Sequence, residues 1–267
     1  RKKMLNLSKS VTSSSLIKLA SAAAVVSVLS FGATIAEAGT IVGSKHDLSS
    51  GGTLAQTNAG TTEVCVFCHT PHGSDTTAEV PLWNKKLTAP GSYTSYSTLG
   101  TATLDGDEAA VGSVSIACLS CHDGTQAMDA VLNAPGSGGY NAAGANLAAG
   151  TNMAGSPFPN FGVDLTNDHP IGIVYGGFEG DDTASYVAQD SGTINSNTQY
   201  WVNSKGNEGV AGRQKNDMIL YARADTKPRV ECASCHDPHN GPDAGVTNVF
   251  LRIKNDNSDV CLSCHVK

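Results

Sequence analysis

The sequence predicts a mostly irregular chain with short helices, and three observations lead to this expectation. Of its 267 residues, 29 are glycine and only 6% are aromatic, so a core built from side chains alone would be small. The long segment between His122 and Cys232 has neither a helical nor a strand period. The eight cysteines fall into four close pairs, where we expect the short helices. Regular structure is expected to be sparse elsewhere.

The first 38 residues contain the three parts of a secretory signal peptide in the usual order. Five basic residues precede an apolar run from Leu19 to Phe31, and Ala36-Glu37-Ala38 provides the small-x-small cleavage pattern. The apolar run is too short to cross a membrane. We therefore predict a signal peptide at 1–38 and one secreted domain at 39–267, located outside the cell or on its surface. The periplasm is the alternative location.

The charge balance limits the possible partners. The chain has a formal net charge of −7, and removing residues 1–38 takes away five basic residues and one acidic residue, leaving −11. Such an acidic chain is not expected to bind nucleic acid, whose phosphates attract basic proteins. No apolar run is long enough for a membrane span. The acidic surface instead favours cationic partners.

The four cysteine pairs share one pattern, in which two residues separate the cysteines and a histidine follows at once. The pattern occurs at Cys65, Cys68 and His69, at Cys118, Cys121 and His122, at Cys232, Cys235 and His236, and at Cys261, Cys264 and His265. C-x-x-C-H is the signature of covalent c-type haem attachment, with the thiols added to the two vinyl groups and the histidine bound to iron. We predict four covalent c-type haems, held by the eight cysteines, with the four histidines as proximal iron ligands. The haems then form the core that the side chains do not supply.

Other uses of paired cysteines explain the pattern less well. A thioredoxin-like redox motif would occur once, near a βαβ unit, and would leave the histidine unexplained. Zinc sites would combine two pairs on one ion and leave the adjacent histidines without a role. Disulfides closing such short loops would add little stability.

Four further histidines match the four distal positions that the haems require. They are His46, His72, His169 and His239. Met128, Met153 and Met218 are alternatives, because methionine also binds haem iron. The matching count favours histidine on both sides of every iron.

His72 and His239 each follow a motif histidine by three residues, with a proline between. Pro71 and Pro238 disfavour helical conformation in the preceding residue, so the motif helix should end there. Two imidazoles on so short a connection cannot reach opposite sides of one iron. We therefore expect His72 and His239 each to bind a different haem from that of the neighbouring motif.

The motifs form two similar units, at 65–122 and 232–265. In each unit a motif with a trailing Pro-His precedes a Cys-Leu-Ser-Cys-His motif. Between them lie the apolar-then-basic segments 81–86 and 249–254, which we expect to run extended over a haem face. Duplication of a di-haem unit explains this arrangement. Asn257-Ser258-Asp259 is typical of a helix N-cap before Cys261.

The chain resembles multihaem cytochromes of the doubled C-x-x-C-H type, and among them the tetrahaem extracellular cytochromes of metal-reducing bacteria that polymerise into conductive filaments. The resemblance lies in Ser44-Lys-His-Asp-Leu-Ser, Cys65-Val-Phe-Cys-His-Thr-Pro-His, Pro81-Leu-Trp-Asn, Ala117-Cys-Leu-Ser-Cys-His-Asp-Gly, Asp168-His-Pro-Ile-Gly and Glu231-Cys-Ala-Ser-Cys-His-Asp-Pro-His. It implies self-association into a filament, with other cytochromes or mineral and metal acceptors as partners. It also makes His46 the candidate ligand to a haem of the neighbouring subunit.

These observations predict an electron carrier without catalytic residues, because iron with two histidine ligands has no open position for a substrate. A discrete soluble periplasmic shuttle is the main alternative. A multihaem reductase would need one iron without a distal histidine. A subunit of an outer-membrane electron conduit is a further alternative.

Overall fold

The computed structural model describes residues 41–52, 60–87, 92–101, 104, 106–136, 138–148, 150–153, 160–176, 178, 184–240 and 250–266. The chain divides into two units, Arg1–Ala38 and Gly39–Lys267, and all of these residues belong to the second. The expected signal peptide therefore lies outside the described residues. Within the described part, no helix combines the length and apolar character needed to cross a membrane.

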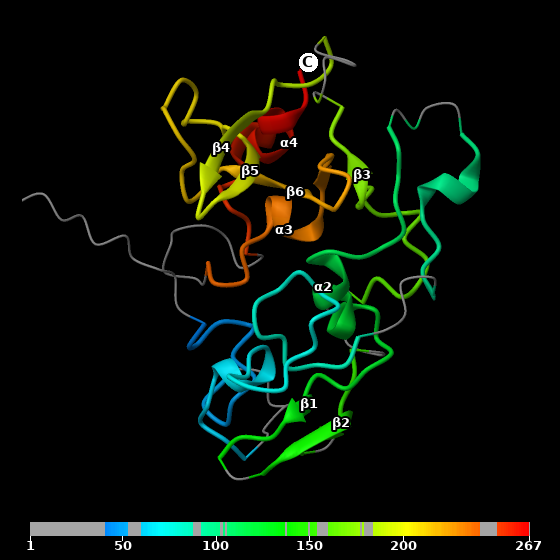
Figure 1. Ribbon diagram of the computed structural model, residues 1–267, viewed down its shortest axis with the longest axis vertical. Helices are drawn as coiled ribbons and strands as arrows, with labels where there is room; N and C mark the ends of the chain where they lie inside the picture. The colour runs from blue at the N-terminus through cyan, green and yellow to red at the C-terminus, as the bar shows by residue number, and fades with distance from the viewer. Residues whose placement is uncertain are drawn as a thin grey trace, which may run out of the picture. The chain divides into compact units, whose positions relative to one another are not determined.

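A short helix lies at each of the four cysteine pairs (Figure 1). These helices are η2 (Cys65–Phe67), α2 (Ser115–His122), α3 (Cys232–Cys235) and α4 (Asp259–Cys264). In α3 and α4 the motif histidine is the C-cap and has extended backbone angles, with φ of −108° at His236 and −98° at His265. The third and fourth motif histidines therefore leave the helix and carry their rings away from its last turn. Two further 3₁₀ turns are η4 (Tyr96–Leu99) and η6 (Asp256–Ser258).

The start of α4 differs in detail from the sequence expectation. Ser258 is the N-cap, but it has a positive φ of 68° and its side chain makes no capping hydrogen bond. The side-chain oxygen of Asn255 instead accepts a hydrogen bond from the backbone N–H of Val260, at 3.2 Å. The cap thus comes from an asparagine just before the cluster at 257–259, because η6 brings Asn255 back to the helix start.

Strands form between α2 and α3, where the sequence predicts loop. β1 (Ala130–Asn133) pairs antiparallel with β2 (Tyr140–Asn146). Five further strands form an antiparallel sheet with the order β3-β7-β6-β5-β4, namely β3 (Ile173–Val174), β4 (Asp190–Ile194), β5 (Asn197–Val202), β6 (Met218–Ala222) and β7 (Pro228–Val230). Most of these strands are too short to show a clear alternation. The expectation of sparse regular structure in this segment is therefore corrected.

The hairpin of β4 and β5 has a turn signal that sequence reasoning missed. Asn195 and Ser196 separate the two strands, and both have positive φ, 49° and 65°. Two consecutive residues of this kind form the type I′ turn that joins antiparallel strands, and asparagine tolerates that conformation. β4 is mostly exposed at the edge of the sheet, whereas β6 is central and begins with three buried residues (Figure 1).

The two cysteine units share a backbone arrangement in which a later segment of the chain returns to the motif helix and bonds to it. We call these the returning segments, 81–86 in the first unit and 250–254 in the second. In the first unit, the N–H of Asn84 donates to the carbonyl of Cys68 at 2.9 Å. In the second, the N–H of Arg252 donates to the carbonyl of Cys235, also at 2.9 Å. Each returning segment also has a left-handed residue two positions earlier, Leu82 or Phe250.

The side chains of Asn84 and Arg252 also make equivalent hydrogen bonds. Asn84 donates to the carbonyl of Val66 at 2.7 Å, and Arg252 donates through Nε to the carbonyl of Ala233 at 3.0 Å. Val66 and Ala233 are both the residue after the first cysteine of the motif. Both returning segments therefore fix the short loop between the two cysteines.

The apolar core of the described residues consists of small clusters. The first surrounds α2, and the second lies against the five-stranded sheet. The third consists of Phe67 at the end of η2 with Leu48 and Met128. Met218 is fully buried in the sheet cluster. Met128 and Met218, which the sequence left open as iron ligands, thus pack among apolar side chains.

α2 and α3 meet at a buried polar junction. The Ser115 hydroxyl donates to the Glu231 carboxylate at 2.5 Å and accepts the backbone N–H of Cys232 at 2.9 Å. Arg223 pairs with the other oxygen of Glu231 at 2.9 Å. Ser115 and Glu231 are both buried, so these bonds are made away from water. This junction brings the second motif next to the third (Figure 1).

We predict that Ser115→Ala lowers the free energy of unfolding by about 1–3 kcal/mol, because it leaves a buried N–H and a buried carboxylate short of a partner. Thermal unfolding of the full-length protein, followed by circular dichroism, measures the change. Ser120→Ala is the matched control, because Ser120 is equally buried in α2 but bonds only to Ala117 of its own helix. Equal losses in the two variants would contradict a special role for the junction.

Candidate haem-binding site

All eight motif cysteines are free thiols in the structure. Burial is the main cause that raises the pKa of Cys68 and of Cys264 to about 12, and that of Cys235 to about 11. Unpaired thiols separated by two residues are the groups that a covalent haem linkage requires.

The two cysteines of the second motif lie beside cysteines of other motifs. Cys118 and Cys121 are both half-buried on α2. A hydrogen bond with the thiol of Cys232, together with burial, raises the pKa of Cys118. Cys121 lies near Cys68. Burial is the largest cause of the raised pKa of Cys68, and the charge of Cys121 is the second.

The sequence did not indicate which other motifs lie near Cys121. The motif pattern associates Cys121 only with Cys118 and His122, whereas the fold also brings it near the first motif. The difference arises because α2 packs between the segments that carry the first and third motifs, which no local spacing in the sequence indicates. The attachment points of the first three motifs therefore lie close to one another.

Six of the eight histidines approach one another in three pairs. The ring centres are 6.1 Å apart for His69 and His239, 6.3 Å for His46 and His122, and 6.5 Å for His169 and His265. Each pair joins one motif histidine to one of the four further histidines that the sequence identifies as distal candidates. The partners come from distant parts of the chain in every case.

The three distances suit a shared metal ion. Two imidazoles that bind one ion from opposite sides have ring centres about 6 Å apart, because each metal–nitrogen bond is about 2 Å and the ring centre lies about 1 Å behind the nitrogen. Direct stacking would bring the rings closer, as it does for His46 and Phe250, whose centres are 4.1 Å apart. The donor set and its spacing therefore fit haem iron with histidine on both sides.

Backbone carbonyls fix the tautomer of two of these rings. Nδ1 of His69 lies 2.8 Å from the carbonyl of Pro81, and Nδ1 of His169 lies 2.9 Å from that of Pro170. A carbonyl only accepts, so each Nδ1 carries the proton and donates it. Nε2 is then left with the lone pair that a metal needs, which is the usual arrangement around ligating histidines.

The ring of His239 is supported by a carboxylate, that of Asp237, instead of a backbone carbonyl. This carboxylate lies 3.6 Å from Nδ1 of His239 and accepts the backbone N–H of that residue at 3.0 Å. The carboxylate raises the pKa of His239, and the pKa of Asp237 falls to about 2, mainly because of His239. A negative charge behind the ring orients it and makes it a more basic ligand.

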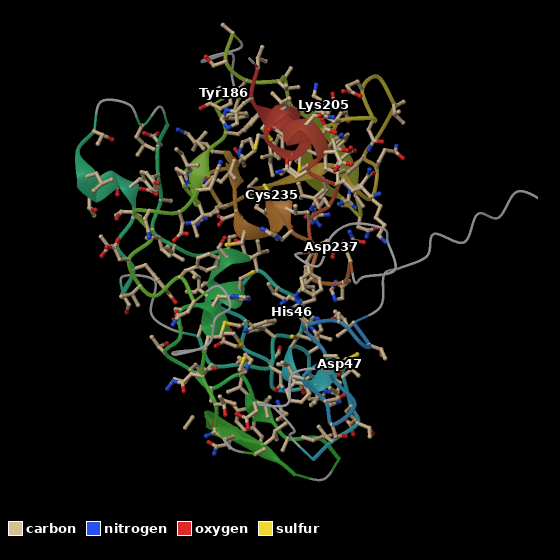
Figure 2. The ribbon with its side chains drawn as sticks, turned by 180° about the vertical axis from the view of Figure 1, so that it is seen from behind. His46, Asp47, Tyr186, Lys205, Cys235 and Asp237 are labelled. Atoms are coloured by element: carbon tan, nitrogen blue, oxygen red, sulfur yellow. The ribbon has the colours of Figure 1, made fainter. Side chains whose placement is uncertain are left out.

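The ring and the backbone of His46 are both fixed by contacts within the chain. Its ring stacks on Phe250 at an angle of 10°, and burial lowers its pKa to about 4, so the ring is neutral at physiological pH. Asp47 fixes the loop by accepting the N–H of Gly43 and both the N–H and hydroxyl of Ser49. Figure 2 shows His46 beside the Asp237 segment that follows α3.

This placement bears on the role that the resemblance implies for His46. The ring faces His122 of its own chain at the distance of a shared ion and is covered by Phe250. The geometry thus favours His46 as a ligand within the chain, whereas its role toward a haem of a neighbouring subunit stays a prediction.

His72 and His236 lie outside these three pairs. His72 is exposed, and its carbonyl accepts hydrogen bonds from Thr70 and Asn133. His236 follows α3 and forms a bridge with Leu251 of the returning segment. The structure therefore brings together six of the eight predicted iron ligands in pairs.

Several residues that support the site were not identified from the sequence. Phe250 covers His46, Asp237 orients His239, and Asn84 fixes the first motif. Asp237 is close to His239 in sequence, and ligating histidines often donate to a carboxylate, so Asp237 is the supporting residue that the sequence could have indicated. Nothing local marks Phe250, whose contact joins distant segments.

Comparison with known proteins agrees with this site. Residues 227–267 match a family described as the doubled CXXCH motif, and the match covers the third and fourth motifs. No similarity to a curated protein was found. The C-x-x-C-H pattern of the matched segment also occurs at Cys65 and Cys118, and this repeated pattern is the one that attaches c-type haem in multihaem cytochromes.

Proposed function

We propose that this protein is a tetrahaem electron carrier in which every iron has two histidine ligands. The observation that carries the proposal is the set of three histidine pairs with ring centres 6.1–6.5 Å apart. The cysteines of each motif hold the porphyrin edge, and the motif histidine binds the iron. When bound, each c-type haem supplies a one-electron redox centre.

The distances support a specific ligand assignment. His69 pairs with His239, His122 with His46, and His265 with His169. His72 and His236 remain, and by elimination they form the fourth pair. The first and third motifs then exchange distal ligands, because His72 follows the first motif and His239 follows the third.

This exchange ties the two cysteine units together. His239 is three residues from His236, yet its ring is nearly parallel to that of His69, at 11°. The short Asp237-Pro238 connection therefore spans two adjacent metal positions. Close redox centres are the condition for electrons to pass from one end of the chain to the other.

Two histidines on each iron also favour a carrier over an enzyme. Both axial positions are then filled by the protein, so no iron offers an open site to a substrate. Histidine on both sides also gives a lower potential than the histidine–methionine pair. A reductase would require one of the pairs to be absent.

The setting follows from the sequence and the resemblance. The signal peptide at 1–38 and the acidic mature chain favour a secreted protein at the cell surface or outside it. The resemblance to filament-forming cytochromes extends the proposal to end-to-end assembly, with other cytochromes or mineral and metal acceptors at the ends. A discrete periplasmic shuttle shares the same haem sites.

The first test is the cofactor content of the purified protein. A pyridine haemochrome assay is expected to give four haems per chain, and carbon monoxide is expected to leave the spectrum of the reduced protein unchanged, because no axial position is open. Fewer than four haems would overturn the tetrahaem proposal, whereas four haems with carbon monoxide binding would favour the reductase.

The ligand assignment has a separate test. His239→Ala should convert one of the four irons from low spin to high spin, measured by electron paramagnetic resonance. In a Cys65→Ala/Cys68→Ala background, which lacks the first haem, the same substitution should add no high-spin signal. The matched background is Cys232→Ala/Cys235→Ala, in which the high-spin signal should still appear. The reverse pattern would assign His239 to the haem of its own motif.

Assembly is tested on the native secreted material. Negative-stain electron microscopy should show filaments that contain this chain and its haems. Separate particles of the size of one chain would favour the soluble shuttle and would leave the four haem sites unaffected.

A further inference from the structure

Lys85 is a cation inside the protein, next to the first motif. Only 1% of the residue is exposed. Its ammonium group donates to the carbonyls of Met128 at 2.7 Å, Ala130 at 2.8 Å and Ala127 at 3.4 Å. Three carbonyl oxygens match the three donors of an ammonium group.

The charge of Lys85 is not neutralised by an ion pair with any described residue. Asp129 is the buried carboxylate nearest in sequence to those three carbonyls. Its Oδ2 atom accepts the N–H groups of Ala148 and Gly150, and its Oδ1 atom has no hydrogen-bond partner among the described residues. Lys85 thus differs from Arg223, which is paired with Glu231. A buried charge without an ion partner acts on its surroundings with little screening by water.

The returning segment places this charge against the cysteine loop of the first motif. The preceding residue, Asn84, bonds to Cys68 and to Val66. The Lys85 ammonium bonds to the carbonyl of Met128, and Met128 lies in the apolar cluster against which Cys68 packs. The field of Lys85 therefore reaches the point where a haem would be attached.

The second cysteine unit has no such charge at the same position. Asn84 and Arg252 occupy equivalent places, so the next residue, Ile253, is the counterpart of Lys85. Ile253 is buried among the apolar side chains of the sheet cluster.

Arg252 does bring a cation to the third motif, but a carboxylate accompanies it. Its guanidinium lies 3.9 Å from the carboxylate of Asp237, whose pKa is low enough to keep it ionised. The counterpart of Asp237 in the first unit is Thr70, which is neutral. Asp237 also stands behind His239, the ligand proposed for the first haem, so its charge acts on both haems. The buried charge of Lys85 is then the difference between the two motifs.

We propose that Lys85 sets the electron-transfer order of the two related motifs by raising the reduction potential of the haem at Cys65 and Cys68 above that of the haem at Cys232 and Cys235. A nearby positive charge stabilises the reduced form, which carries one more electron. The inference depends on the proposed haem content, and it concerns a residue that touches neither the cysteine sulfurs nor the histidine rings in the contacts described.

The test is a redox titration of the four-haem protein followed by its visible spectrum. Lys85→Met removes the charge and keeps the length of the side chain. One of the four components should shift to lower potential, which corresponds to a change on the order of tenfold in its oxidised-to-reduced ratio at fixed potential. Lys85→Arg should keep the component near its original position.

Lys86→Met is the matched control, because Lys86 is the next residue and is exposed. It should leave all four components in place. An unchanged titration in Lys85→Met with four haems bound, or an equal shift in Lys86→Met, would overturn the proposal.

If Lys85→Met does not fold, the proposal can be tested on the unmodified protein by measuring the order in which its haems are reduced. Nuclear magnetic resonance of partly reduced samples should show the haem of the first motif reduced at higher potential than that of the third. The opposite order would overturn the proposal. The haemochrome assay is independent of this order, so failure of the haem sites and failure of the Lys85 proposal give different results.

Discussion

In the proposed haem sites, each motif supplies its own cysteines and one imidazole, and the second imidazole comes from another part of the chain. Three of the four motifs meet this requirement within the described residues, with partners that lie 76, 170 and 96 positions away in sequence for His122, His69 and His265. Contacts at such separations are costly in chain entropy, and the apolar clusters that could offset this cost are small. In the proposed sites, binding of iron by the histidine pairs would offset part of this cost.

Hydrogen bonds and a carboxylate contact outside the sheets support the rings of these pairs. Nδ1 of His69 and of His169 are fixed by carbonyls of Pro81 and Pro170, and His239 is oriented by Asp237. The returning segments fix the cysteine loops through Asn84 and Arg252. Each of these bonds is local or joins a segment to its own motif, so these side chains are positioned by contacts near them in the chain. The junction of Ser115 and Glu231 then joins the units through a buried contact.

The sequence was informative where chemistry requires fixed spacing. The C-x-x-C-H repeats identify the cysteines and their histidines, and Pro71 and Pro238 indicate that His72 and His239 leave their motifs. Pairing could not be read in the same way, because nothing near His46 indicates His122 or Phe250, and nothing near Cys121 indicates Cys68. The five-stranded sheet was missed because its strands are short, although Asn195-Ser196 is a turn signal. Lys85 appears in sequence as one of two adjacent lysines, and only the fold distinguishes the buried one from the exposed one.

A duplicated unit gives two sites of the same construction, and electron transfer with a direction requires that they differ. The backbone cannot supply the difference, because the same hydrogen bonds hold both cysteine loops. Side chains at equivalent positions can, since a buried charge changes a potential without moving a ligand. Thr70 and Lys85 in the first unit stand where Asp237 and Ile253 stand in the second. Asp237 lies near Arg252 and also supports His239, which is proposed to bind the first haem, so its charge does not distinguish the two sites. The exchange of Ile253 for Lys85 does distinguish them, because it adds a buried positive charge beside the first motif.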